Sequence, residues 1–196
     1  MDFSSKVYIV TGAARGIGLA VTQALLKHNA TVYAVDLDPK ISDGLASLPD
    51  QARLHYHQCD VRKRSSCQAV FEAALAKSSK IDGLVNNAGV CPLEGELPGD
   101  DVYDLCFDVN VRGVWNMGTE ALKAMKTSGG GGIVNLASIS ALVGVRRLPL
   151  YTATKHAVLG FTRTWALDFA QYGIRVNCVA PGEFIPNGKP TIVMCC

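Results

Sequence analysis

The sequence lacks any long uninterrupted apolar stretch, and this argues against a membrane-spanning segment. No window approaches the roughly 20 apolar residues that a bilayer crossing requires, and the opening MDFSSKVYIVTG has no basic segment followed by an apolar one. Charge of either sign is also not in excess, because 19 basic residues against 17 acidic ones leave a formal net charge of +2. This balance gives no indication of a polyanion-binding surface. We therefore expect a cytoplasmic protein without membrane or nucleic-acid partners.

Paired cysteine motifs are absent as well. The seven cysteines are an odd number and none has CxxC spacing, so neither a disulfide framework nor a metal site is indicated. Cys59, Cys106 and Cys178 lie in segments that we expect in the core, which favours reduced thiols. The terminal pair Cys195 and Cys196 does not complete the four-residue pattern of a prenylation signal.

What the sequence contains is a regular alternation of short β-branched runs with longer helical patterns. The runs are KVYIVT, TVYAVD, RLHYHQCD, DGLVNNA, GIVNLAS and IRVNCVA, and the helical patterns include residues 16–28, 65–77, 101–125 and 151–171. Connections of this length join parallel strands. The sequence therefore predicts an α/β fold, a doubly wound parallel sheet of about six strands. We expect one domain over residues 1–196, of which 183–196 form an atypical tail.

A glycine-rich loop follows the first of these runs. In TGAARGIG, Gly12, Gly16 and Gly18 lie where the strand turns into a helix that begins near Ile17. Glycines permit a tight turn and a close approach to a ligand, and the N–H groups of a helix N-terminus attract a pyrophosphate. Tight turns without a ligand have the same composition, so the position after the first strand is what favours a dinucleotide.

The end of the second run indicates which dinucleotide would bind. Asp36 follows Gly18 by eighteen residues, and a carboxylate there accepts hydrogen bonds from ribose hydroxyls and repels the extra phosphate of NADP. NAD is therefore the favoured cofactor. NADP stays the alternative, because Arg15 in the glycine loop can meet such a phosphate and Asp36 can equally be a turn residue in DLDP.

A candidate catalytic group lies in SISALVGVRRLPLYTATK, residues 138–155. Tyr151 and Lys155 are four residues apart on a predicted helix and share one face. An ammonium group near a phenol favours the phenolate, so we expect Lys155 to lower the pKa of Tyr151. The YxxxK pattern is also common on ordinary helix surfaces, and a second observation is needed to favour chemistry.

Ser138 supplies that second observation. It closes the predicted strand GIVNLAS, and the carboxyl ends of parallel strands form the ligand crevice of such folds. Its hydroxyl can hold a substrate oxygen beside Tyr151, with Ser140 as a rival hydroxyl. Asn110, polar among apolar neighbours, can be a helix bend, a satisfied core amide or the holder of a water near Lys155.

In their order and spacing, these motifs resemble the short-chain dehydrogenase/reductase family from Lys6 to Gly182. TGAARGIG resembles the family's cofactor loop, NNAG its fourth-strand motif, and VNVRG, Ser138 and YTATK its catalytic set. The resemblance implies hydride transfer between NAD(P) and a small-molecule alcohol or ketone. It also implies that Tyr151 transfers the hydroxyl proton, Ser138 orients the substrate oxygen, Lys155 binds the nicotinamide ribose, and Asn110 supports a proton relay.

The same resemblance implies a full set of site residues. The expected catalytic residues are Asn110, Ser138, Tyr151 and Lys155. The expected cofactor-binding residues are Gly12, Arg15, Gly16, Ile17, Gly18, Asp36, Asp60, Val61, Asn87, Ala88, Gly89, Tyr151, Lys155, Pro181 and Gly182, with Asp60 and Val61 at the adenine. Cys91, just after NNAG, is expected as a small buried filler, with a place in the pocket as the alternative. Helices near 111–125 and 151–171 imply a homodimer or homotetramer.

The resemblance fails after RVNCVAPG. Pro186 stands where the family has a cofactor-binding threonine, and Thr191 lies too far along the chain. The final strand and the substrate lid are expected to be missing, which would leave IRVNCVA as an open sheet edge unless TIVM forms a short strand over it. A catalytically weak or inactive dinucleotide-binding protein is therefore the alternative function, and an interaction protein without cofactor or substrate is a third.

Overall fold

The chain folds around one seven-stranded sheet in the order β3-β2-β1-β4-β5-β6-β7. The computed structural model describes residues 2–92, 94–182 and 192–195. The first six strands are parallel: β1 Val7–Thr11, β2 Thr31–Asp36, β3 Leu54–Gln58, β4 Gly83–Asn86, β5 Gly131–Leu136 and β6 Ile174–Pro181. The predicted six-stranded parallel sheet is confirmed, with the strand order reversing between β1 and β4.

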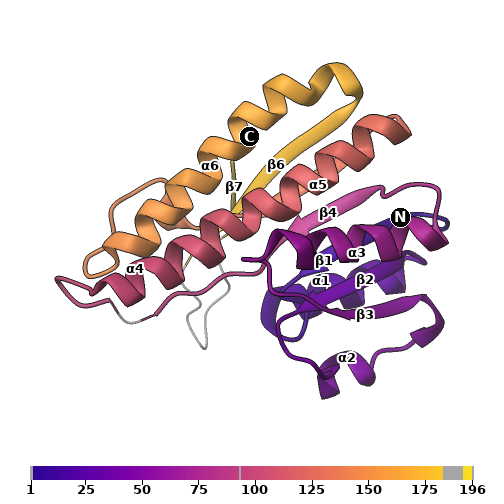
Figure 1. Cartoon of the computed structure of the whole chain (residues 1–196), viewed down its shortest axis with the longest axis horizontal. Helices are drawn as coiled ribbons and strands as arrows, with labels where there is room; N and C mark the ends of the chain where they lie inside the picture. Colours follow the sequence, from indigo (N-terminus) through magenta and orange to yellow (C-terminus); the bar gives the residue numbers. More distant parts are fainter. Residues whose placement is uncertain (1, 93, 183–191, 196) are drawn as a thin grey trace.

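Helices cover the two faces of the sheet in two groups (Figure 1). One group packs on one face and comprises α3 (Arg64–Lys77), α5 (Gly113–Ser128) and α6 (Pro149–Phe169). The other group, α1 (Gly16–Lys27) and the short α2 (Asp43–Ala46), packs on the opposite face. Ile9 and Val10 illustrate the division, because neighbouring strand residues point to opposite faces. Both are fully buried, Ile9 with the first group and Val10 with the second.

The helix predicted over residues 101–125 is divided by a wider turn. α4 (Asp100–Phe107) passes into a π-helical segment, Asp108–Arg112, which continues into α5 (Figure 1). Single π-helical turns inside α-helices often occur at functional sites. This segment contains Asn110, so the wider turn places that amide at the junction of α4 and α5.

The edge of the sheet differs from the expectation. β6 is paired by a short antiparallel strand, β7 (Ile192–Cys195), in which Ile192 lies opposite Pro181. The possible strand at residues 191–194 is thus found one residue further along, and β6 is not an open edge. The comparison of Pro186 and Thr191 with the family's threonine falls outside the described residues.

The structure also shows where the cysteines lie and how apolar the helices are. Cys59, Cys106 and Cys178 are buried, as expected for core thiols. Within the described ranges, none of the helices combines the length and the apolar composition that a bilayer crossing needs.

Candidate active site

Two adjoining cavities lie at the carboxyl ends of the parallel strands, where ligands bind in open α/β sheets. The larger has a volume of about 420 Å³ and the smaller about 260 Å³. They share the lining residues Ile17, Asn87, Gly89 and Val90, so the two spaces form one continuous region. The larger volume falls within the roughly 300–1,000 Å³ of small-molecule and cofactor sites.

Most of the predicted site residues line these two cavities. Around the larger lie Gly12, Arg15, Ile17, Asp36, Asp60, Val61, Asn87, Ala88 and Gly89. Around the smaller lie Ile17, Asn87, Gly89, Ser138, Tyr151, Lys155, Pro181 and Gly182. Gly16, Gly18 and Asn110 line neither cavity.

The glycine loop is held in place by the end of β4. The Asn87 side chain donates hydrogen bonds to the carbonyls of Thr11 and Gly12, at 2.9 and 3.0 Å. Gly12 has φ +62°, and a Cβ there would lie 2.9 Å from the Ala88 Cα. Gly18 packs directly against the Gly12 carbonyl, which leaves no room for a side chain. Gly18 therefore serves the site through packing, by letting α1 start close to the loop.

Asp36 has both a structural contact and a place in the larger cavity. One carboxylate oxygen accepts the Ala14 N–H at 2.8 Å and the other accepts the Leu37 N–H at 2.8 Å. These bonds fix the carboxylate at the end of β2 beside the glycine loop. Each oxygen keeps a further lone pair for a ligand hydroxyl. Both readings of Asp36, turn residue and ligand carboxylate, are therefore compatible with the structure.

The other carboxylate of this cavity, Asp60, is paired with Arg62. The guanidinium donates to both carboxylate oxygens at 2.8 Å, and this hydrogen bonding lowers the pKa of Asp60. Val61 is held through its carbonyl, which accepts a 2.9 Å hydrogen bond from the Asn116 side chain. Both residues are thus rigidly placed at the end of β3.

The donor set fits a dinucleotide. Among the described residues, no side chain caps the N-terminus of α1, so its first-turn N–H groups are available to an anion. Gly12 brings the loop backbone to the cavity, where a pyrophosphate would bind. Asp36 offers hydrogen-bond acceptors beside it, at the place of the neighbouring adenosine ribose. The smaller cavity extends this region toward Tyr151 and Lys155.

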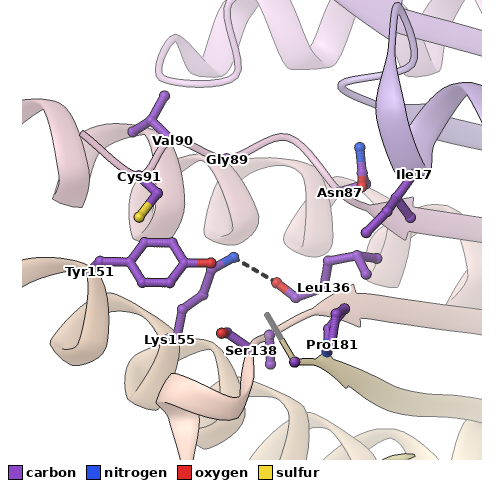
Figure 2. A pocket seen from close by; sticks show the side chains of 12 residues that line it. Ile17, Asn87, Gly89, Val90, Cys91, Leu136, Ser138, Tyr151, Lys155 and Pro181 are labelled. Atoms are coloured by element: carbon purple, nitrogen blue, oxygen red, sulfur yellow. Dashed lines mark hydrogen bonds between the residues drawn. The ribbon is translucent and has the colours of Figure 1, made fainter. Parts of the chain in front are cut away.

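Tyr151 and Lys155 lie on the first turns of α6 and face the smaller cavity (Figure 2). The Lys155 Nζ donates a 2.8 Å hydrogen bond to the Leu136 carbonyl at the end of β5, and lies 5.5 Å from the centre of the Tyr151 ring. Lys155 is only 5% exposed. The predicted pair is therefore brought together at one site.

The structure distinguishes the two candidate hydroxyls. Ser138 lines the smaller cavity together with Tyr151. The Ser140 backbone N–H donates to the Ser138 Oγ at 3.2 Å, and the Ser140 Oγ accepts from the Ser138 hydroxyl at 3.3 Å. Ser140 therefore orients Ser138, which is the hydroxyl placed to meet a substrate.

Burial dominates the pKa of Tyr151. Removal from water raises this pKa above its ordinary value, and the nearby Ser138 side chain lowers it only in part. The expectation that Lys155 brings the pKa of Tyr151 down is therefore wrong, because the sequence shows the neighbour but not the desolvation. Burial also lowers the pKa of Lys155, to about 8. At neutral pH the site thus contains a protonated phenol and an ammonium group.

Asn110 is a fully buried amide whose side chain is satisfied by protein groups. Its Oδ1 accepts the Val90 N–H at 2.8 Å, and its Nδ2 donates to the Val90 carbonyl at 2.9 Å and to the Thr154 Oγ1 at 3.2 Å. Asn110 is therefore a satisfied core amide that ties the loop after β4 to α6. A relay role would have to use its backbone rather than this side chain.

Sequence reasoning missed several polar residues that hold the site together. Thr11 accepts the N–H groups of Asn87 and Ala88 at 3.0 Å. Asn135, near the carboxyl end of β5, joins Asn86 to the Thr162 hydroxyl through two 2.9 Å hydrogen bonds. A buried-strand asparagine and threonine are visible in the sequence, but their partners are distant along the chain and no local pattern reveals them.

Cys91 is placed differently from the expectation. It is exposed and lines the smaller cavity with its sulfur toward the Tyr151 ring (Figure 2). The prediction of a buried filler is wrong, and the alternative of a pocket residue is confirmed.

Comparison with known proteins identifies the family of the chain. A family model for short chain dehydrogenases matches residues 6–189. The chain is 36% identical to oxidoreductase UcpA of Escherichia coli K12, covering 91% of this chain and 69% of that protein. It is 37% identical to cyclopentanol dehydrogenase of Comamonas sp. strain NCIMB 9872, covering 91% and 73%.

A solved structure of NAD⁺-bound xylitol dehydrogenase superimposes with a TM-score of 0.88 at 30% identity, covering 93% of this chain and 72% of that one. The family model thus spans most of the chain, and curated oxidoreductases match it over most of their own length. The chain belongs to the short-chain dehydrogenase/reductase family of NAD(P)-dependent dehydrogenases.

Proposed function

We propose that this enzyme interconverts a secondary alcohol and a ketone, with NAD(H) as its cofactor. The observation that carries the proposal is the meeting of the Tyr151 hydroxyl, Ser138 and Lys155 in a cavity continuous with the larger one at β2. Two relatives are named for cyclopentanol and xylitol, molecules that carry secondary hydroxyl groups. Oxidation of a secondary hydroxyl group matches a site in which Tyr151 transfers the proton and Ser138 orients the substrate oxygen.

The residues that would hold the dinucleotide follow from the geometry. The glycine loop and the first turn of α1 would bind the pyrophosphate, Asp36 the adenosine ribose, and Lys155 the nicotinamide ribose. The chemistry that the dinucleotide supplies is hydride transfer. The protein's own contribution is to orient the substrate and to move the hydroxyl proton.

In ketone reduction, Tyr151 would donate its proton to the substrate oxygen. Its raised pKa keeps the phenol protonated at neutral pH, so the acid form is the resting form. Ser138, which lines the same cavity, would hold the same substrate oxygen in place. The Lys155 ammonium, 5.5 Å from the ring, would offset the negative charge that proton donation leaves on Tyr151.

Asp36 supports NAD over NADP. The carboxylate is fixed beside the glycine loop by the N–H groups of Ala14 and Leu37, so it cannot turn away from a ribose phosphate. A phosphate placed there would meet a negative charge at close range. Arg15, exposed on the same loop, is the residue that would favour NADP.

The test of this function is Tyr151→Phe. We expect kcat for alcohol oxidation and ketone reduction to fall about 10²–10⁴-fold, because only the proton-transferring oxygen is removed. The rise in melting temperature caused by NADH should stay at the wild-type value. Tyr103→Phe is the matched control, since Tyr103 is exposed and stacks on Phe107 away from the cavities.

Cyclopentanol, xylitol and their ketones are the first substrates to assay. Wild-type turnover in Tyr151→Phe would contradict the proposed mechanism. NADH binding without turnover of any alcohol or ketone by the wild type would instead support an inactive dinucleotide-binding protein.

We further infer that the enzyme forms a homo-oligomer. α5 exposes Trp115, 43% accessible, which lies 5.6 Å from the Phe161 ring of α6. Trp115 is exposed beside the partly buried Phe161, and an apolar surface of this kind on two adjacent helices favours burial against another chain. Sedimentation equilibrium distinguishes a monomer from a dimer or tetramer, and a monomer at micromolar concentration would contradict the inference.

A further inference from the structure

Glu94 is a buried carboxylate that the proposed mechanism does not use. It lies in the loop between β4 and α4 and is only 6% exposed. One of its oxygens accepts the Leu150 N–H at 2.7 Å and the other accepts the Tyr151 N–H at 2.7 Å. The Cys106 thiol approaches the second oxygen at 3.9 Å. Both carboxylate oxygens are therefore directed at the start of the helix that carries Tyr151.

These two N–H groups are the ones that a helix cap normally satisfies. α6 begins with Pro149, which has no N–H, and its N-cap residue Leu148 provides no side-chain hydrogen bond. Leu150 and Tyr151 are thus the first donors without a partner inside the helix. A residue 56 positions earlier supplies the acceptor, and its negative charge also suits the positive end of the helix dipole.

The loop that carries Glu94 is also tied down at its other end. The Val90 N–H and carbonyl are both bonded to the Asn110 amide, at 2.8 and 2.9 Å. Cys91 follows Val90 directly and faces the cavity beside Tyr151 (Figure 2). The hydrogen bonds of Val90 and Glu94 therefore fix the position of Cys91, which forms one wall of the cavity, relative to α6.

We propose that Glu94 is a positioning residue that clamps the loop after β4 onto the first turn of α6. The clamp sets the place of the Tyr151 backbone and of the Cys91 side chain relative to each other. Its kinetic consequence rests on the proposed function, because the substrate would lie between these two side chains and the cofactor cavity. Glu94 touches no reacting group and acts only through the residues that it holds.

The experiment compares Glu94→Ala and Glu94→Gln with wild type, using Glu96→Gln as the matched control. Glu94→Gln keeps the shape and one acceptor oxygen, so it remains informative if Glu94→Ala does not fold. Glu96 is on the same loop, but its side chain is 81% exposed and its nearest cation, Arg147, lies 3.6 Å away. Glu96→Gln should therefore behave as wild type in every measurement.

The direct readout is hydrogen exchange at the Leu150 and Tyr151 amides, which needs neither cofactor nor substrate. We expect exchange at one or both amides to become at least tenfold faster in each Glu94 variant. The pKa of Cys91 is raised by partial desolvation at the cavity wall and by the Glu94 charge. Each variant removes that charge, so alkylation of Cys91 by iodoacetamide should also become faster. Unchanged exchange at both amides would overturn the clamp, whatever the alkylation rate, because the alkylation rate reports the loss of the Glu94 charge.

The kinetic readout separates positioning from simple stabilisation. In Glu94→Gln we expect kcat to fall about tenfold while the Kd of NADH stays at the wild-type value, because the cofactor cavity does not contact Glu94. Faster amide exchange with unchanged kcat and KM would overturn the positioning role. If the wild type turns over no alcohol or ketone, the proposed function fails, whereas the amide-exchange result still decides the clamp.

Discussion

Lys155 combines deep burial with a positive charge, and this combination controls its chemistry. Its side chain donates to the Leu136 carbonyl at 2.8 Å, and removal from water lowers its pKa to about 8. The group is therefore mostly charged at pH 7 and mostly neutral at pH 9. Tyr151 keeps its proton over this whole range, because burial raises the pKa of the phenol.

The titration of Lys155 predicts an alkaline limit for ketone reduction. We expect kcat/KM for a ketone, measured with saturating NADH, to fall as pH rises above about 8. Above this pH the Lys155 side chain loses its positive charge, which would offset the negative charge left on Tyr151 by proton donation. Lys155→Met should show low activity without this decline. A pH profile from 6 to 10 tests it, and a wild-type profile that stays flat to pH 10 would contradict the assignment.

The same residue predicts how stability changes with pH. The pKa of Lys155 is lower in the folded protein than in the unfolded chain, so the unfolded state binds more protons between about pH 8 and the ordinary lysine pKa of about 10.4. The free energy of unfolding of the wild type should therefore rise in this window relative to that of Lys155→Met. Urea unfolding at pH 7 and pH 10 measures the difference, and a relative fall would show that Lys155 is stabilised as an ammonium.

Individual site residues were predictable where local sequence carries the signal. Tyr151 and Lys155 are four positions apart on a helix, and Asp36 ends a strand, so their meeting follows from fold class and spacing. Glu94 could not be found this way, because its function depends on a contact with Leu150 that is 56 residues distant. The direction of the Tyr151 pKa shift was missed for a related reason, since burial is a property of the assembled core.

Among the elements, the parallel strands were predictable because their apolar runs are long enough to be buried on both faces. The short α2 was not, since its four residues have no helical period and depend on Ser42, whose side chain accepts the Leu45 N–H at 3.3 Å. The π-helical segment was also not predictable as such. Its residues continue the helical pattern of α4 and α5, and only the wider turn distinguishes it.

The two faces of β6 should respond differently to the same substitution. Val176 is 4% exposed and belongs to the core beneath helices α3, α5 and α6. Val179 lies on the opposite face of the sheet and is half-buried. Valine to threonine preserves β-branching and size but introduces a hydroxyl. We expect Val176→Thr to lower the free energy of unfolding by about 1–3 kcal/mol and Val179→Thr to change it by about 0.5 kcal/mol or less. Urea denaturation tests both, and equal losses would mean that the second face is also packed.

For the molecule as a whole, the site lies across the middle of the sheet. Its adenosine end is built from the carboxyl ends of β1, β2 and β3, and its catalytic end from β5 and α6. The Asn87 and Asn110 side chains join these two parts through the loop after β4. A dinucleotide would therefore contact both halves of the fold at once, and its binding should be visible as stability of the entire chain.

A thermal-shift measurement with NADH and NADPH tests this directly. A ligand that binds only the folded state adds about 2.7 kcal/mol at a concentration of 100 times its Kd, which corresponds to a rise of roughly 5–10 °C for a chain of this size. We expect such a rise with NADH and a much smaller one with NADPH, because the fixed Asp36 carboxylate repels the additional phosphate. Asp36→Asn removes that charge and should bring the two shifts closer together. A larger shift with NADPH in the wild type would assign the specificity to Arg15 instead, and no shift with either would contradict the cofactor site.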